Sequence, residues 1–266
     1  PTIFNGEPIA ATYLTYDEAA AQAAETPFDV VLYAVKYGAL AEAMEQSALL
    51  VGADTAIISV LNGVTSEEVL AERFGWDRVL LCVAQQMDSR KVGPVVTAGC
   101  VGVLALGVRD GESPVQQANL SRVTAWLSAI DQPFICPKDI RHQLWGKLIC
   151  NVGVNQVCAV YDCCFDGIHA PGEAREAMIG AMGEVAAVGR AEGVALTDAD
   201  VAYWLDIIDH LNPAGMPSLR QDVLARRPTE VELFSGTINR LGVAHGIPTP
   251  VNERFYAAIK ALEASW

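Results

Sequence analysis

The feature that most constrains the fold is an alternation of apolar runs with amphipathic segments between residues 28 and 84. Three runs are apolar for nearly their whole length, as parallel strands covered on both faces are: residues 28–36, 55–61 and 79–84. Helical patterns at residues 39–50 and 66–74 separate them, and the second has two glutamates in its first turn. This β-α-β-α-β order predicts an open α/β sheet with right-handed crossovers.

Around this block the sequence predicts further elements of the same sheet domain. They are a hairpin of residues 2–4 and 9–15 turning through Asn5-Gly6, a brief helix at 19–24, an antiparallel strand pair between Gly93 and Gly107, a helix at 116–130 and a short strand at 133–137. Ligands of such open sheets bind beyond the carboxyl ends of the strands.

From Asp139 onward the pattern is helical to the end of the chain. The expected helices are 139–156, 173–192, 197–209, 218–226, 230–245 and 250–264. The change of period near Pro137 predicts a domain boundary, with a sheet domain at residues 1–137 and an all-α domain at residues 138–266.

Composition limits the classes of partner. The 266 residues are 52% apolar and 19% charged, which is typical of a globular protein without extended disorder. A formal net charge of −14 argues against a nucleic-acid partner or an anionic membrane surface. The longest apolar run, residues 95–108, is too short to cross a bilayer as a helix. We therefore expect no membrane association and a cytoplasmic location.

The cysteines and histidines do not suggest a metal site. Seven cysteines are an odd number without C-x-x-C spacing: Cys82, Cys100, Cys136, Cys150, Cys158, Cys163 and Cys164. We interpret them as reduced, mostly buried thiols of a cytosolic protein. The four histidines also lack metal-ligand spacing, so no metal is predicted.

The clearest candidate for chemistry lies in the first helix of the second half. Lys147, Asn151 and Asn155 recur every four positions within an otherwise apolar run. On an α-helix they lie within roughly 80° of one another along about 12 Å of the axis. An amine and two amides are costly to bury without polar partners, so they favour a cleft that holds a polar small molecule. The alternative is a partly solvated helix face with a snorkelling lysine.

Polar residues also follow two of the predicted strands. Lys36 closes the first buried strand and Asn62-Gly63 follows the second. Each is open to the simpler interpretation of a solvated strand end or a turn. Together with the polar helix face they indicate a cleft between the domains, a common location for a small ligand.

A second carboxylate-bearing segment lies further along the helical half. Ser218 suits a helix N-cap, and Gln221 three residues later completes a capping box. Thr229 can cap the helix that begins at Glu230. These structural interpretations suffice for isolated motifs. They do not explain why a second carboxylate-bearing segment lies in the same domain as the row of Lys147, Asn151 and Asn155.

The combined motifs resemble those of one family. They are the strand ending in Val35-Lys36, the Asn62-Gly63 turn, Trp145-x-Lys147-x-x-x-Asn151-x-x-x-Asn155, Ser218-x-x-Gln221-Asp222, Thr229-Glu230 with Gly236, and residues 246–250 with Asn252. Their order and intervals over essentially the whole chain are similar to those of the ketopantoate reductase (2-dehydropantoate 2-reductase) family.

The resemblance implies a Rossmann domain, a helical C-terminal domain and NADPH-dependent reduction of a 2-oxo acid, 2-dehydropantoate to pantoate, on the coenzyme A pathway. It also implies roles for single residues: Lys147 as the catalytic general acid, Glu230 as the carboxylate at the substrate and cofactor, Asn62, Asn151, Asn155 and Ser218 at the substrate, and Lys36 and Asn62 at the cofactor. The apolar C-terminal helices suggest a homodimer.

Two departures from the family pattern keep alternatives open. The phosphate-binding G-x-G-x-x-G is absent, and the sequence begins with Pro1 near the family's third strand. A non-enzymatic binding module is therefore one alternative. Leu61 stands where a glutamine often precedes Asn-Gly in the family. A paralogue that reduces another 2-oxo acid or an imine is the second alternative.

Overall fold

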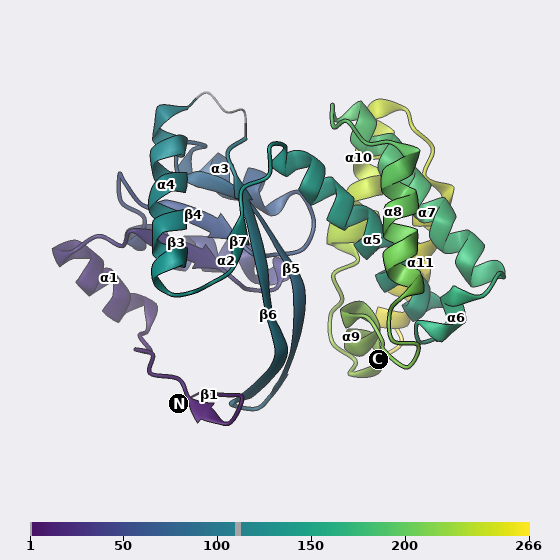
Figure 1. The fold of residues 1–266 in the computed structure, drawn as a ribbon, viewed down its shortest axis with the longest axis horizontal. Coiled ribbons are helices and arrows are strands. Elements are labelled where there is room, and N and C mark those ends of the chain that lie inside the picture. The colour runs from purple at the N-terminus through teal and green to yellow at the C-terminus, as the bar shows by residue number, and fades with distance from the viewer. Residues whose placement is uncertain (1, 110–112) are drawn as a thin grey trace. The chain divides into compact units, whose positions relative to one another are not determined.

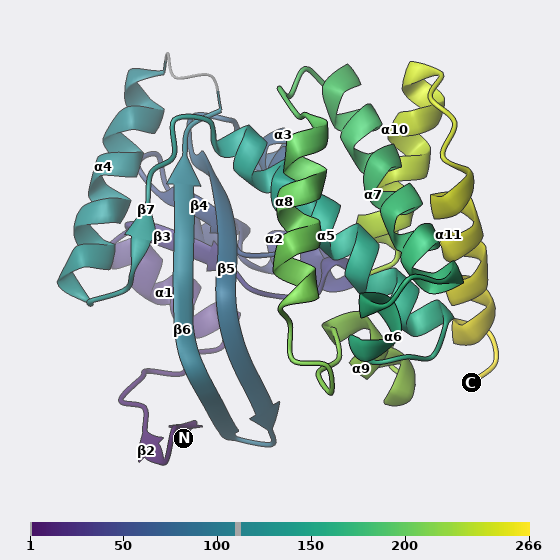
Figure 2. The same cartoon turned by 45° about the vertical axis from the view of Figure 1, so that its right-hand side comes forward.

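The computed structural model describes residues 2–109 and 113–266, shown as ribbons in Figures 1 and 2. The chain forms two compact units, and each has its own core. Residues 1–62 and 66–140 form the sheet unit, and residues 63–65 and 141–266 form the helical unit. The fold class is as predicted from the sequence, whereas the domain boundary at residue 137 stays a prediction.

The sheet unit combines a mixed sheet with helices. Its elements are β1 (Ile3–Phe4), β2 (Glu7–Pro8), α1 (Tyr16–Glu25), β3 (Val30–Tyr33), η1 (Tyr37–Ala39), α2 (Leu40–Gln46), η2 (Ala48–Leu50), β4 (Ala56–Ser59), α3 (Ser66–Phe74), β5 (Val79–Val92), β6 (Val95–Gly107), α4 (Pro114–Ala129) and β7 (Phe134–Ile135). The strand order is β2-β1-β6-β5-β4-β3, and β7 pairs with β6. Strands β3, β4 and β5 are parallel, while β5 and β6 form a long antiparallel hairpin.

Apolar side chains cover both faces of the central strands. Ile57 of β4 packs with side chains of α2 and α3, such as Leu40 and Leu70. The next residue, Ile58, points to the opposite face and packs with Val123 of α4. Figure 1 shows α4 on one face of the sheet, with α2 and α3 on the other. This alternation along one short strand explains why the sequence is apolar without interruption there.

Four strand predictions need correction. The hairpin turns through Asn5-Gly6, both at positive φ (49° and 90°), but its second strand is residues 7–8, not 9–15. Strand β3 was expected to be covered on both faces, yet Leu32 is 41% exposed, because α4 packs on β4 and β5 instead. Strand β5 runs beyond Ala84 because its continuation pairs with β6. The antiparallel pair expected between Gly93 and Gly107 is therefore wrong: that segment is the single strand β6, and its partner is β5.

The helical unit is built around α5. Its elements are α5 (Ile140–Val160, with Ile140 counted in the sheet unit), α6 (Asp166–His169), α7 (Glu173–Ala191), α8 (Asp198–Asp209), α9 (Ser218–Leu224), η3 (Glu232–Gly236), α10 (Thr237–His245) and α11 (Pro250–Glu263). Figure 2 shows α7, α8 and α11 around α5. Glycine permits a close approach of α5 and α7: a Cβ added at Gly153 would lie 2.6 Å from Met182 Cγ of α7.

Most predicted helices match the structure within a few residues, but the one expected at 230–245 does not. It begins with the π-helical turn η3, in which Gly236 N–H donates to Val231 C=O at 2.9 Å, and continues as α10. The helix expected at 39–50 is divided into η1, α2 and η2. The spacing of apolar residues in the sequence does not reveal either the π-helical turn or the division of the helix at 39–50.

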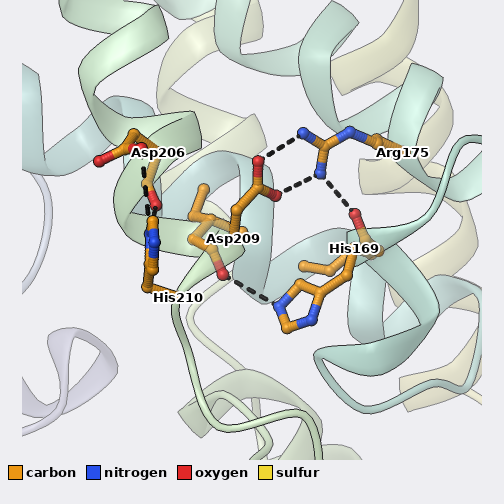
Figure 3. Close-up of polar contacts among 7 residues, drawn as sticks. His169, Arg175, Asp206, Asp209 and His210 are labelled. Atoms are coloured by element: carbon orange, nitrogen blue, oxygen red, sulfur yellow. Dashed lines mark hydrogen bonds and ion pairs between the residues drawn. The ribbon is translucent and has the colours of Figure 1, made fainter.

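One polar cluster ties three helices of this unit together (Figure 3). Arg175 of α7 donates two hydrogen bonds to the Asp209 carboxylate of α8, at 2.6 and 2.9 Å. Its guanidinium also donates to the Ile168 carbonyl of α6 at 2.8 Å. His169 Nε2 lies 3.0 Å from the Ile208 carbonyl. The end of α8 is thus attached to α6 and α7 by charge-assisted hydrogen bonds.

The cysteines differ from the expectation that most are buried. All seven are free thiols, and only Cys82 and Cys158 are buried, whereas Cys100 and Cys136 are exposed. Among the helices that the structure describes, none combines the length and apolar character needed to cross a membrane.

Candidate functional site

The polar row of the sequence lies along α5 in the helical unit. Asn155 is buried, while Asn151, one turn earlier, and Lys147, two turns earlier, are partly buried. Between them the helix presents apolar residues such as Leu148 and Val152, both buried in the core. Core packing therefore fixes the helix and holds the amine and the two amides in one row.

Asn155 anchors the start of α9 to α5. Its Oδ1 accepts hydrogen bonds from Ser218 Oγ at 3.2 Å and from the Leu219 N–H at 3.3 Å. The capping box predicted for Ser218 is wrong, because Pro217 is the N-cap and makes no side-chain cap. The Ser218 hydroxyl instead points to Asn155, which is 63 residues away in the sequence. Two of the predicted substrate residues are thereby brought into contact.

Asn151 has an unsatisfied donor. Its Oδ1 lies 3.5 Å from Asn155 Nδ2, which is a long hydrogen bond. Its own Nδ2 is buried and has no hydrogen-bond partner in the part of the chain that the structure describes. A buried amide N–H without an acceptor is costly and calls for an explanation, such as a ligand.

The neighbourhood of Lys147 keeps a thiol neutral. Burial raises the pKa of the Cys150 thiol to about 12, even though the positive charge of Lys147 acts to lower it. At neutral pH no thiolate forms beside the lysine. Cys150 therefore does not neutralise the Lys147 ammonium.

Glu230 lies just before η3. It is buried, at 8% exposure, and its backbone carbonyl accepts from the Leu233 N–H at 3.0 Å. Thr229 Oγ1 accepts from the Val231 N–H at 3.3 Å, but the Thr229 N–H and hydroxyl both donate to Glu263. Thr229 therefore accepts a hydrogen bond from the residue after Glu230, as predicted for a cap, and also donates to Glu263 of α11. These bonds fix the backbone on which Glu230 lies.

Lys36 and Asn62 occupy matching positions in the sheet unit. Tyr33 and Ser59 are paired in register at the ends of the parallel strands β3 and β4. Lys36 and Asn62 each come three residues later, so both follow carboxyl ends at the same edge of the sheet. Lys36 is exposed and Asn62 is partly buried. After Asn62, Gly63 has φ +91°, and a Cβ there would lie 3.2 Å from Leu233 Cδ2.

The polar side chains at this edge suit one part of a nicotinamide cofactor. Strand-end lysine and asparagine side chains can donate to a ligand's oxygens beyond the sheet. The sequence contains no G-x-G-x-x-G, the loop that binds a dinucleotide's pyrophosphate. The fit is thus limited to Lys36 and Asn62.

Sequence reasoning missed several buried polar residues near these sites. Gln156 and Ser235 are fully buried, and the Ser235 N–H donates to Gln156 Oε1 at 3.1 Å. Glu67 was seen only as a first-turn acid of α3, yet it is 1% exposed. A glutamine within a helical apolar run was the available signal for Gln156. No sequence signal distinguishes Glu67 from its exposed neighbour Glu68.

The sheet unit also contains a cavity of about 480 Å³ beyond the carboxyl ends of β6 and β7. Arg109, Cys136 and Lys138 are among its lining residues. None of the sequence-predicted site residues lines it. Across the described ranges, no cluster of His, Cys, Asp and Glu has the geometry of a metal site.

Two family models match the chain. A model described as "Ketopantoate reductase PanE/ApbA" matches residues 4–110, and one described as "Ketopantoate reductase PanE/ApbA C terminal" matches residues 139–263. A 2-dehydropantoate 2-reductase of Vibrio cholerae is 35% identical over 128 residues, which cover 48% of this chain and 43% of that protein. The aligned part is thus less than half of that relative's length. One of Streptococcus pyogenes is 24% identical over 89% of this chain and 76% of its own.

Solved structures share the fold. A D-mandelate dehydrogenase, in a ternary structure with NADH and anilino(oxo)acetate, superposes with a TM-score of 0.84 at 21% identity, covering 98% of this chain and 84% of that one. A dimeric ketopantoate reductase from Staphylococcus aureus gives a TM-score of 0.77 at 24% identity, covering 90% and 79%. At these identities the likeness concerns the fold alone.

Proposed function

Because the chain belongs to the ketopantoate reductase family, a family of oxidoreductases, we propose that it reduces 2-dehydropantoate (ketopantoate) to pantoate with NADPH. The observation that carries this proposal is the row on α5. It combines an amine at Lys147, a buried amide donor without an acceptor at Asn151, and Asn155 attached to Ser218. An anionic 2-oxo acid offers the oxygen atoms that such donors bind.

Lys147 is the general acid in this proposal. A bound reduced nicotinamide cofactor would supply the hydride for the ketone carbon. The carbonyl π electrons then move to oxygen, where the Lys147 ammonium stabilises the developing alkoxide and transfers a proton to it. The resulting amine regains its proton from solvent. Cys150, held neutral by burial, neither accepts that proton nor reduces the ammonium's charge.

The amides and the hydroxyl orient the substrate without adding net charge. Asn155 is held by Ser218 Oγ and the Leu219 N–H, so its side chain is preorganised. The Nδ2 group of Asn151 gains an acceptor when a substrate oxygen approaches. Glu230, buried beside η3, accepts a hydrogen bond from a substrate hydroxyl. Each contact of this kind contributes about 1–3 kcal/mol to discrimination.

Lys36 and Asn62 hold the cofactor in this scheme, with Asn62 near both the nicotinamide and the substrate. Their matched positions beyond β3 and β4 support the assignment. Glu230 is assigned to the cofactor as well as to the substrate. Titration of the protein with NADPH and with NADH, followed by nicotinamide fluorescence, tests both binding and the preference for NADPH.

The decisive test is the rate of NADPH oxidation with ketopantoate. We expect Lys147→Ala to lower kcat by about 100-fold or more, the usual contribution of a positioned general acid. Lys138→Ala is the matched control, because Lys138 is an exposed lysine nine residues earlier whose loss should leave the rate unchanged. Undiminished turnover by Lys147→Ala would remove the proposed proton donor.

A second candidate is a paralogue with the same chemistry on another 2-oxo acid or an imine. Leu61 favours it, since this residue is buried among Tyr33, Leu40 and Ile57 and offers no polar group where the family often has glutamine. A substrate panel at fixed NADPH separates the candidates. A higher kcat/KM for another 2-oxo acid than for ketopantoate would favour the paralogue.

We also propose a cytoplasmic homodimer. The dimeric state named for the Staphylococcus aureus relative supports the assembly, and exposed apolar side chains of the helical unit, such as Val243, are available to an interface. Sedimentation equilibrium of the protein tests it, and a monomer at micromolar concentration would contradict it.

A further inference from the structure

Neighbouring residues of α5 reach two different segments of the helical unit. Asn155 binds the start of α9 through Ser218 and Leu219. Gln156, about 100° further round the helix, binds η3 instead, because its Oε1 accepts from the Ser235 N–H at 3.1 Å. The start of α9 and η3, the turn that follows Glu230, are therefore attached to neighbouring residues at one end of the Lys147–Asn151–Asn155 row.

The contact with Gln156 accompanies an unusual backbone. In a regular α-helix the Ser235 N–H would donate to the Val231 carbonyl. Here that carbonyl accepts from Gly236 at 2.9 Å, across five residues, and from Phe234 at 3.2 Å. The Ser235 N–H is directed to Gln156 instead. Such π-turns are rare and occur frequently at functional sites.

A second layer of hydrogen bonds fixes the orientation of the Gln156 amide. Its Nε2 donates to the Val152 carbonyl at 3.1 Å and to Asn252 Oδ1 at 3.4 Å. Asn252 Oδ1 also accepts from Ser235 Oγ at 3.0 Å, and Asn252 Nδ2 donates to Glu184 at 2.7 Å. Gln156, Ser235 and Asn252 are all fully buried. Rotation of any one of these groups would leave buried polar atoms without partners.

We propose that Gln156 is a positioning residue for the reduction, whose side-chain amide holds η3, and through it Glu230, in register with the Lys147–Asn151–Asn155 row. This inference rests on the proposed function. Gln156 does not touch the substrate in this scheme. It acts by fixing where the Glu230 carboxylate lies relative to the amine and amides that bind the keto acid.

The test compares two substitutions with a matched control. Gln156→Met keeps the volume and removes the acceptor for the Ser235 N–H. Gln156→Glu restores an acceptor and, when protonated, also a donor. Gln116→Met is the control, because Gln116 is likewise buried and donates to the backbone carbonyls of Trp76 and Val79, but within the sheet unit.

We expect Gln156→Met to lower kcat about 10-fold with the KM for NADPH unchanged, and to accelerate hydrogen exchange of the Ser235 amide. Gln116→Met should change neither. The carboxyl introduced by Gln156→Glu is fully buried, so its pKa is raised. The kcat of the Gln156→Glu variant, relative to that of the unmodified protein, should therefore recover as the pH falls from about 8 to about 6 and the carboxyl is protonated.

The outcomes separate the two proposals. Unaltered Ser235 exchange in Gln156→Met overturns the inference whatever the turnover. Accelerated exchange with an unchanged kcat also overturns it and leaves the proposed function intact. If Gln156→Met does not fold, a Gln156→Glu rate that fails to recover at lower pH overturns it instead. No turnover of any 2-oxo acid by the unmodified protein overturns the proposed function, and with it the role of Gln156.

Discussion

Glu67 is a single residue whose environment opposes its charge. Its Oε2 accepts from Ser66 Oγ at 2.9 Å, whereas its buried Oε1 has no hydrogen-bond partner among the described residues. Burial raises the pKa of this carboxyl to about 7, although hydrogen bonds from Ser66 and from the backbone of Glu67 and Cys82 act to lower it. The folded state therefore binds a proton more strongly than the unfolded chain does.

This shift makes stability depend on pH. The stabilisation from a raised carboxyl pKa is fully present below the unfolded value of 4.5 and is lost as pH rises through about 7. We expect Glu67→Gln to avoid this loss. Its free energy of unfolding relative to the unmodified protein should rise by about 1–3 kcal/mol between pH 5 and pH 8. Urea unfolding at both values measures it.

The exposed neighbour provides the control for that measurement. Glu68→Gln in the same helical turn should show no comparable change between the two pH values, because Glu68 is exposed. A Glu67→Gln variant whose relative stability falls as pH rises would contradict the assignment of a buried carboxyl with a raised pKa.

At the same scale, the sequence identified residue types better than their partners. The four-residue spacing predicted that Lys147, Asn151 and Asn155 share a helix row, because that depends only on helix geometry. It could not predict that the Ser218 hydroxyl binds Asn155, since a local cap and a tertiary hydrogen bond use the same side chain. The burial of Glu67 likewise depends on strands and helices far away in the sequence.

Among the helices, the Arg175–Asp209 pair joins α7 to the last residue of α8 (Figure 3). Hydrogen bonds from Arg175 hold the pKa of the Asp209 carboxyl below its usual value, despite partial burial. The stabilisation is therefore present above the unfolded pKa and is lost as pH falls through the lowered one. The Asp209 side chain is 38% exposed, so solvent screening reduces the contribution.

We expect Arg175→Lys to lower the free energy of unfolding by about 1 kcal/mol at neutral pH, because lysine cannot reproduce the two parallel hydrogen bonds. The difference should shrink in acid as Asp209 is protonated. Arg190→Lys is the control on the same helix, since Arg190 lies 3.9 Å from an exposed Asp198. Equal losses in the two variants, measured by urea unfolding, would argue against a special role for Arg175.

Helix and strand boundaries show why some elements could be predicted and others not. The helix expected at residues 66–74 is α3 without change, because its first-turn acids and apolar period are local signals. The π-turn η3 was missed because the acceptor of its Ser235 N–H is Gln156, 79 residues earlier in the chain. The continuation of β5 to Val92 was missed because its pairing with β6, not its own pattern, makes it a strand.

At the scale of the whole molecule, the change from alternating strands and helices to a continuous helical pattern predicted a sheet half and a helical half. That change was visible because each half buries its own apolar faces. The extent of each unit was less visible. Residues 63–65 follow the second buried strand in sequence, yet they belong to the helical unit, where Leu233 lies close to Gly63.

Two cores lead to a prediction about how the protein unfolds. Glu67 lies in the sheet unit and Arg175 in the helical unit, and their hydrogen-bond partners do not overlap. We expect differential scanning calorimetry at pH 8 to resolve two transitions rather than one. Glu67→Gln should raise the midpoint of one transition, and Arg175→Lys should lower that of the other. A single transition that both substitutions shift would mean that the two cores unfold as one cooperative unit.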